Sequence, residues 1–143
     1  MARTAALDLL ARREHSELEL RRKLETRGFD ADVIATLVAA LVAERLLSND
    51  RFAESFVHSR FQRGSGPQKI HAELRARGLD DELIGQSIAA LDTQWPVLAR
   101  EVRAKRFGAA VPADFKERSR QMRFLQQRGF TTEQISGSFR DSE

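Results

Sequence analysis

Apolar residues along this chain recur three or four positions apart, and no long segment alternates strictly between apolar and polar residues. The clearest case is the stripe of Ile34, Leu37, Val38 and Leu41, which fits one face of a helix with about 3.6 residues per turn. The pattern predicts an all-α fold without strands. The predicted helices cover approximately residues 4–13, 17–27, 31–45, 50–62, 67–77, 81–92, 95–107, 113–128 and 132–140.

The inner face of each predicted helix is set by its larger apolar residues. We expect Val33, Val42, Leu46 and Leu47 to widen the inner face of the helix over residues 31–45, which should make it the best buried. The remaining core is predicted to consist of Leu7, Leu10, Leu20, Leu24, Ile34, Leu37, Val38, Leu41, Phe52, Phe56, Phe61, Ile70, Leu74, Leu83, Ile84, Ile88, Leu91, Leu98, Val102, Phe115, Met122 and Leu125.

Polar residues and one glycine mark where several of these helices begin and end. Ser16 with Glu19, and Thr131 with Gln134, have the spacing of a capping box, in which two side chains satisfy the free N–H groups of a helix start. Gly78 is placed to end its helix in the left-handed conformation. These residues are therefore predicted to have structural roles.

The dipeptide Arg-Gly followed by Phe or Leu occurs three times, at spacings of 50 and 51 residues. Its glycines are Gly28, Gly78 and Gly129, and each is followed six positions on by an isoleucine. Because chance rarely keeps helix end, core residue and register together, the chain is predicted to contain three tandem helical repeats of three helices each. We place them at residues 1–46, 47–93 and 94–143.

The third repeat departs from the other two at a core position. It has Gln121 where the first two repeats have Leu20 and Ile70. This helix of the third repeat is therefore predicted either to pack differently or to be rotated about its axis.

Charge is distributed unevenly, although 24 basic and 21 acidic residues leave a net charge of only +3. Residues 94–130 carry nine basic and three acidic side chains, a net charge of +6, whereas residues 1–48 are neutral and 49–93 carry −1. A basic repeat favours contact with a polyanion or an acidic protein face, and the alternative is an ordinary solvated helix surface. The candidate contact residues are Arg100, Arg103, Lys105, Arg106, Lys116, Arg118, Arg120, Arg123 and Arg128, joined by Arg60, Arg63 and Lys69 beside the loop at residues 64–67.

No aromatic residue alternates with these charges in a stacking pattern, so the sequence gives little support for a platform that stacks single-stranded bases.

The sequence contains no arrangement that indicates catalysis, a metal or a cofactor. It has no cysteine, which fits a reducing compartment, and His15, His58 and His71 have no partner at metal-ligand spacing. Ser65 has no base arranged for nucleophilic catalysis, and loop 64–67 lacks the lysine of a phosphate-binding P-loop. No apolar run approaches the roughly 20 residues of a membrane helix. We therefore expect a cytoplasmic, non-enzymatic protein without cofactor or metal. We also expect a monomer.

The central part of the chain carries three motifs in order. Leu47–Ala53 reads LSNDRFA, Gly64–Pro67 reads GSGP, and Ile70–Leu79 reads IHAELRARGL. Together with the opening stretch Ala6–Gly28, these segments resemble the RecX family of bacterial RecA regulators. The resemblance is good over residues 5–92 and fair over the rest of the chain. It implies three-helix repeats stacked into an elongated, curved array.

The resemblance also implies a function. Proteins of this family bind RecA and its single-stranded-DNA filament, limit filament extension, and dampen ATP hydrolysis, strand exchange and the coprotease activity that triggers the SOS response. The expected partners are therefore RecA and its filament, with weak direct DNA binding through the basic repeat and no membrane contact. Two alternatives remain open: a sequence-independent nucleic-acid-binding protein that acts without RecA, and an inert helical scaffold.

Overall fold

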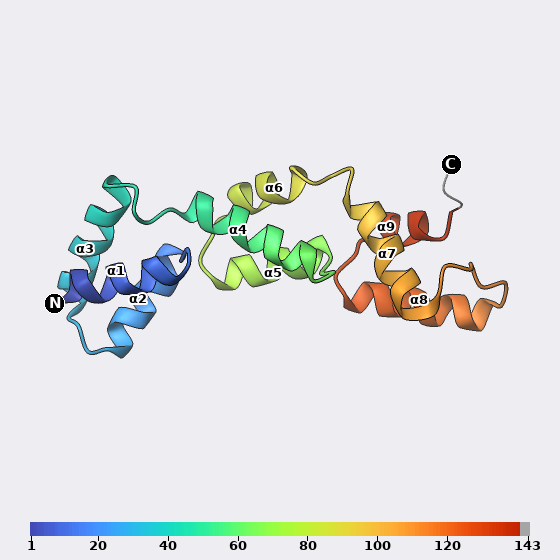
Figure 1. The fold of residues 1–143 in the computed structure, drawn as a ribbon, viewed down its shortest axis with the longest axis horizontal. Coiled ribbons are helices and arrows are strands. Elements are labelled where there is room, and N and C mark those ends of the chain that lie inside the picture. The colour runs from blue at the N-terminus through green and yellow to red at the C-terminus, as the bar shows by residue number, and fades with distance from the viewer. Residues whose placement is uncertain (141–143) are drawn as a thin grey trace. The chain divides into compact units, whose positions relative to one another are not determined.

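The computed structural model describes residues 1–140, which form nine helices and no strand (Figure 1). Every observed helix end lies within three residues of its predicted position, and α6 differs most because residues 90–94 form turns instead. The sequence also predicts that the last helix frays at its end, where it is followed by Asp141–Glu143, and those three residues lie outside the described part of the chain. The helices are α1 Ala2–Arg12, α2 Glu17–Thr26, α3 Ala31–Ala43, α4 Asn49–Gln62, α5 Pro67–Ala76, α6 Asp81–Ala89, α7 Trp95–Phe107, α8 Phe115–Gln127 and α9 Thr132–Ser138.

Both predicted capping boxes are present, and so is the glycine cap. At the start of α2 the Ser16 hydroxyl accepts from the Glu19 N–H at 3.1 Å, and the Glu19 carboxylate accepts from the Ser16 N–H at 3.1 Å. Thr131 and Gln134 make the same reciprocal pair at the start of α9. Gly78 ends α5 with φ +86°, the left-handed conformation that glycine adopts without a steric penalty.

The chain folds into two compact units that share the middle repeat. The first unit consists of Met1–Phe56 with Leu74–Ile84, and the second of Val57–Glu73 with the chain from Gly85 onward. Helices α4, α5 and α6 each contribute residues to both units. The middle repeat therefore adds its apolar residues to two cores, rather than building one of its own.

In the first unit α1, α2 and α3 pack against one another. Their shared core contains Ala6, Leu20, Leu24, Val38 and Leu41, and all five are buried. This core is built from the leucine pair of α2 and the apolar stripe of α3, as the 3.6-residue spacing predicts.

The prediction that Leu7, Val33, Val42 and Leu46 are buried is wrong, because all four are exposed. Helix α1 contacts its neighbours through Ala6, and Leu7 lies about 100° farther around the helix. Neighbouring helices cover α3 along one stripe only, so Val33 and Val42 at its edges face solvent. Leu46 lies in the turn that follows α3.

In the second unit α7 packs against both α8 and α9. Trp95 is buried at the start of α7, where its indole N–H donates to the Ile88 carbonyl at 3.0 Å. Its ring meets that of Phe61 edge to face, with 5.2 Å between the ring centroids. Leu125 and Phe130 complete this core from α8 and the turn after it.

Phe115 is a further correction, since it was predicted to be a core residue and is 82% exposed. It is the first residue of α8, whose buried positions are Gln121 and Leu125. At about 100° per residue, Phe115 lies roughly 120° around the helix from Gln121. The apolar stripe of α8 therefore begins after its first turn and leaves Phe115 in solvent.

Candidate interaction surface and repeat junctions

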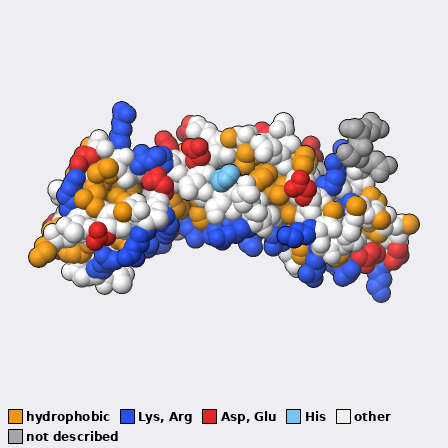
Figure 2. All heavy atoms as spheres, in the orientation of Figure 1, with side chains coloured by type: hydrophobic (Ala, Val, Ile, Leu, Met, Phe, Trp, Pro, Cys, Tyr) orange, Lys and Arg blue, Asp and Glu red, His pale blue; other side chains and the backbone are white. Residues whose placement is uncertain are grey.

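The second unit displays an exposed basic surface, which we define as Lys105, Arg106, Lys116, Arg120 and Arg123. All five residues come from α7 and α8. In Figure 2 basic side chains lie along α8, with a few acidic side chains among them. One of these acids is Glu117, whose carboxylate accepts from Arg120 at 2.8 and 2.9 Å. This hydrogen bond lowers the pKa of Glu117, so the charge of Arg120 is partly neutralised within the chain.

Two arginines of this surface are held against aromatic rings. Phe107 and Phe124 meet edge to face, with centroids 5.3 Å apart and an interplanar angle of 89°. The Arg106 guanidinium lies over the Phe124 ring at 5.3 Å, and that of Arg120 lies over the Phe107 ring at 5.0 Å. Such cation–π contacts fix the guanidinium groups in place while leaving their edges open. The surface therefore presents partly ordered donors suited to carboxylates or phosphates.

Arg103 was predicted to belong to this surface, and that prediction is wrong because the residue is only 2% exposed. Its guanidinium donates to the Ser138 carbonyl at 3.1 Å and to the carbonyls of Ala109 and Ala110 at 3.4 and 3.3 Å. It also donates to the Gln121 side-chain oxygen at 3.4 Å. Burial, followed by repulsion from nearby arginines, lowers the pKa of Arg103. Arg103 therefore holds the third repeat together from inside.

The Arg103–Gln121 contact explains why the third repeat has an amide at a core position. Gln121 is 3% exposed, and its amide nitrogen donates to the Glu117 carboxylate at 3.2 Å while its oxygen accepts from Arg103. A leucine there would leave the guanidinium with one acceptor fewer. The polar pair thus replaces the aliphatic packing of the other two repeats.

Three more predicted contact residues are half-buried and also have structural contacts. Arg100 donates to the Gly137 carbonyl at 3.4 Å, and the Arg118 guanidinium lies 4.6 Å from the centre of the Phe139 ring. Arg128 donates to the Arg63 carbonyl at 2.7 Å. These arginines hold α9 and the turn after α8 in place. Binding a partner would require them to give up these contacts, so they are poor candidates for a binding surface.

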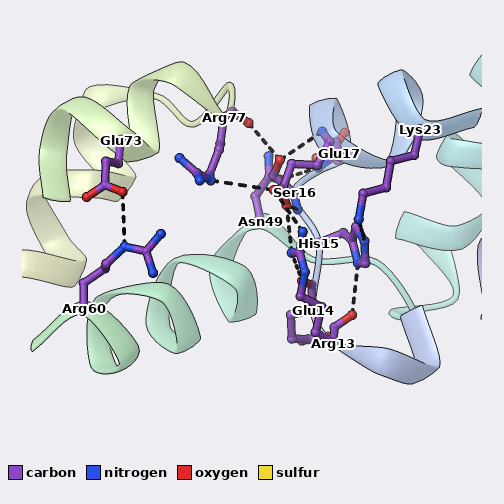
Figure 3. Close-up of polar contacts among 11 residues, drawn as sticks. Arg13, Glu14, His15, Ser16, Glu17, Lys23, Asn49, Arg60, Glu73 and Arg77 are labelled. Atoms are coloured by element: carbon purple, nitrogen blue, oxygen red, sulfur yellow. Dashed lines mark hydrogen bonds and ion pairs between the residues drawn. The ribbon is translucent and has the colours of Figure 1, made fainter. Parts of the chain in front are cut away.

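Of the basic residues near loop 64–67, Arg63 and Lys69 are exposed and Arg60 is half-buried. Arg60 pairs with Glu73 of α5 at 3.1 Å (Figure 3). Arg63 and Lys69 therefore keep their side chains available, whereas the Arg60 side chain is engaged between α4 and α5.

A contact that the sequence reasoning missed lies in the first unit, where the turn after α5 meets the start of α2. Figure 3 shows Ser16 and Arg77 pointing toward each other. The Ser16 hydroxyl donates to the Arg77 carbonyl at 2.8 Å, and the Arg77 guanidinium lies 3.6 Å from the Glu19 carboxylate. A Cβ atom on Gly78 would come within 2.8 Å of the Leu18 side chain. We call this contact the first junction.

Charged groups surround the first junction. Burial alone would raise the pKa of Glu19, but hydrogen bonds from Arg13 and from the Ser16 N–H bring that pKa below its ordinary value. His15 is 1% exposed; its Nδ1–H donates to the Arg13 carbonyl at 3.0 Å and its Nε2 accepts from the Lys23 ammonium at 2.8 Å. A lysine ammonium can only donate, so the ring is neutral. Burial lowers the pKa of His15 accordingly.

The second unit repeats this contact between the turn after α8 and the start of α5. The Gly66 N–H donates to the Arg128 carbonyl at 2.7 Å, and the Gln68 N–H donates to the Gly129 carbonyl at 2.9 Å. A Cβ on Gly66 would overlap the backbone of Gly129 and Phe130, and one on Gly129 would come within 2.5 Å of the Lys69 Cβ. We call this contact the second junction.

Both junctions use the recurring Arg-Gly dipeptide, which we call the Arg-Gly turn. In each case the donor is the residue just before the second helix of one repeat, and the acceptor is the arginine carbonyl of the next repeat. Ser16 donates to Arg77 in the first junction, and Gly66 donates to Arg128 in the second. The recurring Arg-Gly dipeptide was visible in the sequence, but it did not indicate a contact between repeats, because helix capping already accounts for its glycine. The sequence feature that could have indicated the second junction was Gly66, a glycine that ends no helix.

Within residues 1–140 no group of His, Asp or Glu side chains is placed to hold a metal ion. No helix in the same range is long and apolar enough to cross a membrane. The described fold thus consists of three-helix repeats joined by two related junctions, with a basic surface on the last repeat. These features define a protein of tandem three-helix repeats.

Comparison with known proteins identifies the family. Models of the first, second and third three-helix domains of RecX match residues 2–41, 48–88 and 96–137 in order. The chain is 50% identical over 133 residues to the regulatory protein RecX of Halorhodospira halophila, covering 93% of this chain and 83% of the relative. It is 43% identical to that of Pseudomonas savastanoi pv. phaseolicola, covering 93% and 86%. The chain belongs to the RecX family of regulatory proteins.

A solved structure shows the same fold. The crystal structure of RecX from Lactobacillus salivarius matches with a TM-score of 0.82 at 20% identity, covering 96% of this chain and 91% of that one. The all-α prediction and the family resemblance drawn from the sequence are both confirmed.

Proposed function

We propose that this chain is a negative regulator of RecA, which binds RecA and its single-stranded-DNA filament and limits filament extension. Filament-dependent ATP hydrolysis, strand exchange and the coprotease activity behind the SOS response fall as a consequence. The proposal rests on membership of the RecX family. The observation on this chain that carries it is the exposed basic surface of α7 and α8.

The chemistry of this surface fits a nucleoprotein partner. Lys105, Arg106 and Arg123 are exposed, and the structure gives none of them an ion pair with an acid within residues 1–140. Arginine forks bind carboxylates and phosphates with two parallel hydrogen bonds, and a filament offers both. Charge of this kind mainly steers the encounter and fixes the register of binding.

A second candidate function is direct binding of nucleic acid without RecA. The observation that favours it is Phe115, an 82% exposed aromatic ring directly followed by the exposed Lys116. A ring beside a cation suits base stacking combined with phosphate contact. Binding of this kind would weaken steeply with salt, because released counterions drive it.

The test compares two variants that reverse the same number of exposed charges. Lys105→Glu, Arg106→Glu and Arg123→Glu together alter the basic surface, and Arg12→Glu, Arg21→Glu and Arg22→Glu alter exposed positions of the first repeat. Co-sedimentation with RecA assembled on single-stranded DNA should show about tenfold or greater weakening for the first variant and little change for the second. Both should keep the helicity of the parent by circular dichroism.

Equal binding by the two variants would show that the basic surface does not contribute to filament binding. Binding of the parent to single-stranded DNA but not to RecA filaments would favour the second candidate function instead.

A further inference from the structure

Each junction has two sides, an Arg-Gly turn and the start of a second helix. At each end of the repeat series one of these two sides is left uncovered. Each junction joins an Arg-Gly turn to the start of the second helix in the preceding repeat. Within residues 1–140 no repeat covers the Arg-Gly turn of the first repeat, Arg27–Phe29. The start of α8, Asp114–Lys116, is likewise exposed in the described part of the chain.

The unused turn has the same backbone as the used ones. Gly28 has φ +89°, close to the +86° of Gly78 and the +100° of Gly129. A Cβ on Gly28 would nevertheless meet nothing within 4 Å, whereas the other two glycines face a neighbouring repeat closely. Arg27 is exposed as well. The first repeat therefore carries a formed but uncovered docking turn.

The unused start of α8 is uncovered in the same way. Asp114 precedes α8, as Ser16 precedes α2, yet its exposed carboxylate makes no capping hydrogen bond. Phe115 is the first residue of α8 and is 82% exposed, whereas its counterpart Pro67 at the start of α5 is buried. An apolar ring left in water at this position is a site where a covering contact would stabilise the protein.

The two uncovered ends are chemically complementary. In the first junction Arg77 lies beside the carboxylate of Glu19 in the receiving helix, and its carbonyl accepts a hydrogen bond. Glu117 stands in α8 where Glu19 stands in α2, but it already accepts from Arg120 and Gln121. The carboxylate that is open to Arg27 is that of Asp114, which precedes α8 as Ser16 precedes α2. The residue after the glycine, Phe29, is half-buried, and Phe115 is an exposed apolar ring, so both ends carry an aromatic residue.

We infer that copies of this chain associate head to tail, with the Arg27–Phe29 turn of one copy docking on Asp114 and Phe115 of the next. The contact resembles an internal junction but lacks the covalent chain that holds those together, so it is weak. The chain is a monomer when dilute and associates when concentrated or aligned on a common lattice, where the effective concentration rises. This inference goes beyond the proposed function and does not depend on RecA.

Sedimentation velocity on the protein alone tests the inference. The average mass of the parent should rise above the 16.2 kDa of the monomer as concentration approaches about 1 mM. Arg27→Glu alone places two acids face to face, and Asp114→Arg alone places two arginines face to face. Each variant should remain at the monomer mass, whereas an equimolar mixture of the two restores both pairings and should associate again.

Arg12→Glu, an exposed change at the end of α1, is the matched control and should associate like the parent. A parent that keeps the monomer mass throughout, or a mixture that fails to recover, overturns the inference. It is equally overturned if Phe115→Ser leaves the mass profile unchanged and instead weakens binding of a polythymidylate oligonucleotide, because the ring would then serve nucleic acid.

Discussion

Gly66→Ala should lower the free energy of unfolding by about 3 kcal/mol or more. A methyl group at this position overlaps the backbone of Gly129 and Phe130, which cannot move aside as a flexible side chain can. Relieving the overlap requires opening the second junction, which would break the hydrogen bonds from the N–H groups of Gly66 and Gln68. Overpacking typically costs 1–3 kcal/mol, and each lost backbone hydrogen bond adds about 1 kcal/mol.

Two other glycines separate this effect from ordinary glycine effects. Gly28→Ala meets no neighbour within 4 Å and suffers only the strain of a left-handed backbone, about 1 kcal/mol. Gly85→Ala, inside α6 and also without neighbours, should stabilise the helix slightly. Trp95 is the single tryptophan and lies in the second unit, so its fluorescence on thermal unfolding measures the relevant transition. If the thermal unfolding midpoint of Gly66→Ala equals that of Gly28→Ala, the close contact at the second junction does not contribute to stability.

Arg103→Met should lower the free energy of unfolding by about 2–4 kcal/mol. Methionine fills part of the space but donates no hydrogen bond, so the Ser138 carbonyl and the Gln121 oxygen lose their partner inside the protein. A buried polar group left without a partner costs roughly 1–3 kcal/mol. The stacking of the guanidinium on the Phe139 ring at 4.8 Å is lost as well.

The control is Arg106→Met, which removes an exposed guanidinium from the same helix and should lower stability by no more than about 1 kcal/mol, the value of its exposed cation–π contact with Phe124. Arg103→Lys should recover little, because one ammonium cannot reach carbonyls on both α9 and loop 108–114 as the planar fork does. Stability changes of equal size for Arg103→Met and Arg106→Met, measured by Trp95 fluorescence, would show that the buried guanidinium holds nothing together.

Helix positions were predictable because they depend on local signals. The reciprocal pairs Ser16–Glu19 and Thr131–Gln134 and the left-handed Gly78 act within one turn of chain, and the structure shows all of them. The centre of the first-unit core was predictable for the same reason, since the spacing of apolar residues identifies Ile34, Leu37, Val38 and Leu41 as the buried stripe of α3. The edge positions Val33 and Val42 were not, because their burial depends on which helices lie beside α3.

Surface residues were harder to predict because burial depends on which helices meet. Nothing near Arg103 in the sequence distinguishes it from Arg106, three positions away on the same helix; the difference arises from α9 and loop 108–114 closing over one side of α7. Phe115 was predicted to lie in the core because it is hydrophobic, yet no helix within residues 1–140 covers the first turn of α8. Gly66 likewise shows its role only once Gly129 lies against it.

Regulation of RecA by this chain is best tested by following the single-stranded-DNA-dependent ATP hydrolysis of RecA as the protein is added. We expect progressive inhibition of RecA that requires folded protein and is lost with the charge-reversed variant of Lys105, Arg106 and Arg123. Inhibition well below one copy per RecA subunit would place the action at filament ends, and inhibition only near equal amounts would indicate coverage along the filament. Unchanged hydrolysis by demonstrably active RecA would contradict the proposal that this chain regulates RecA.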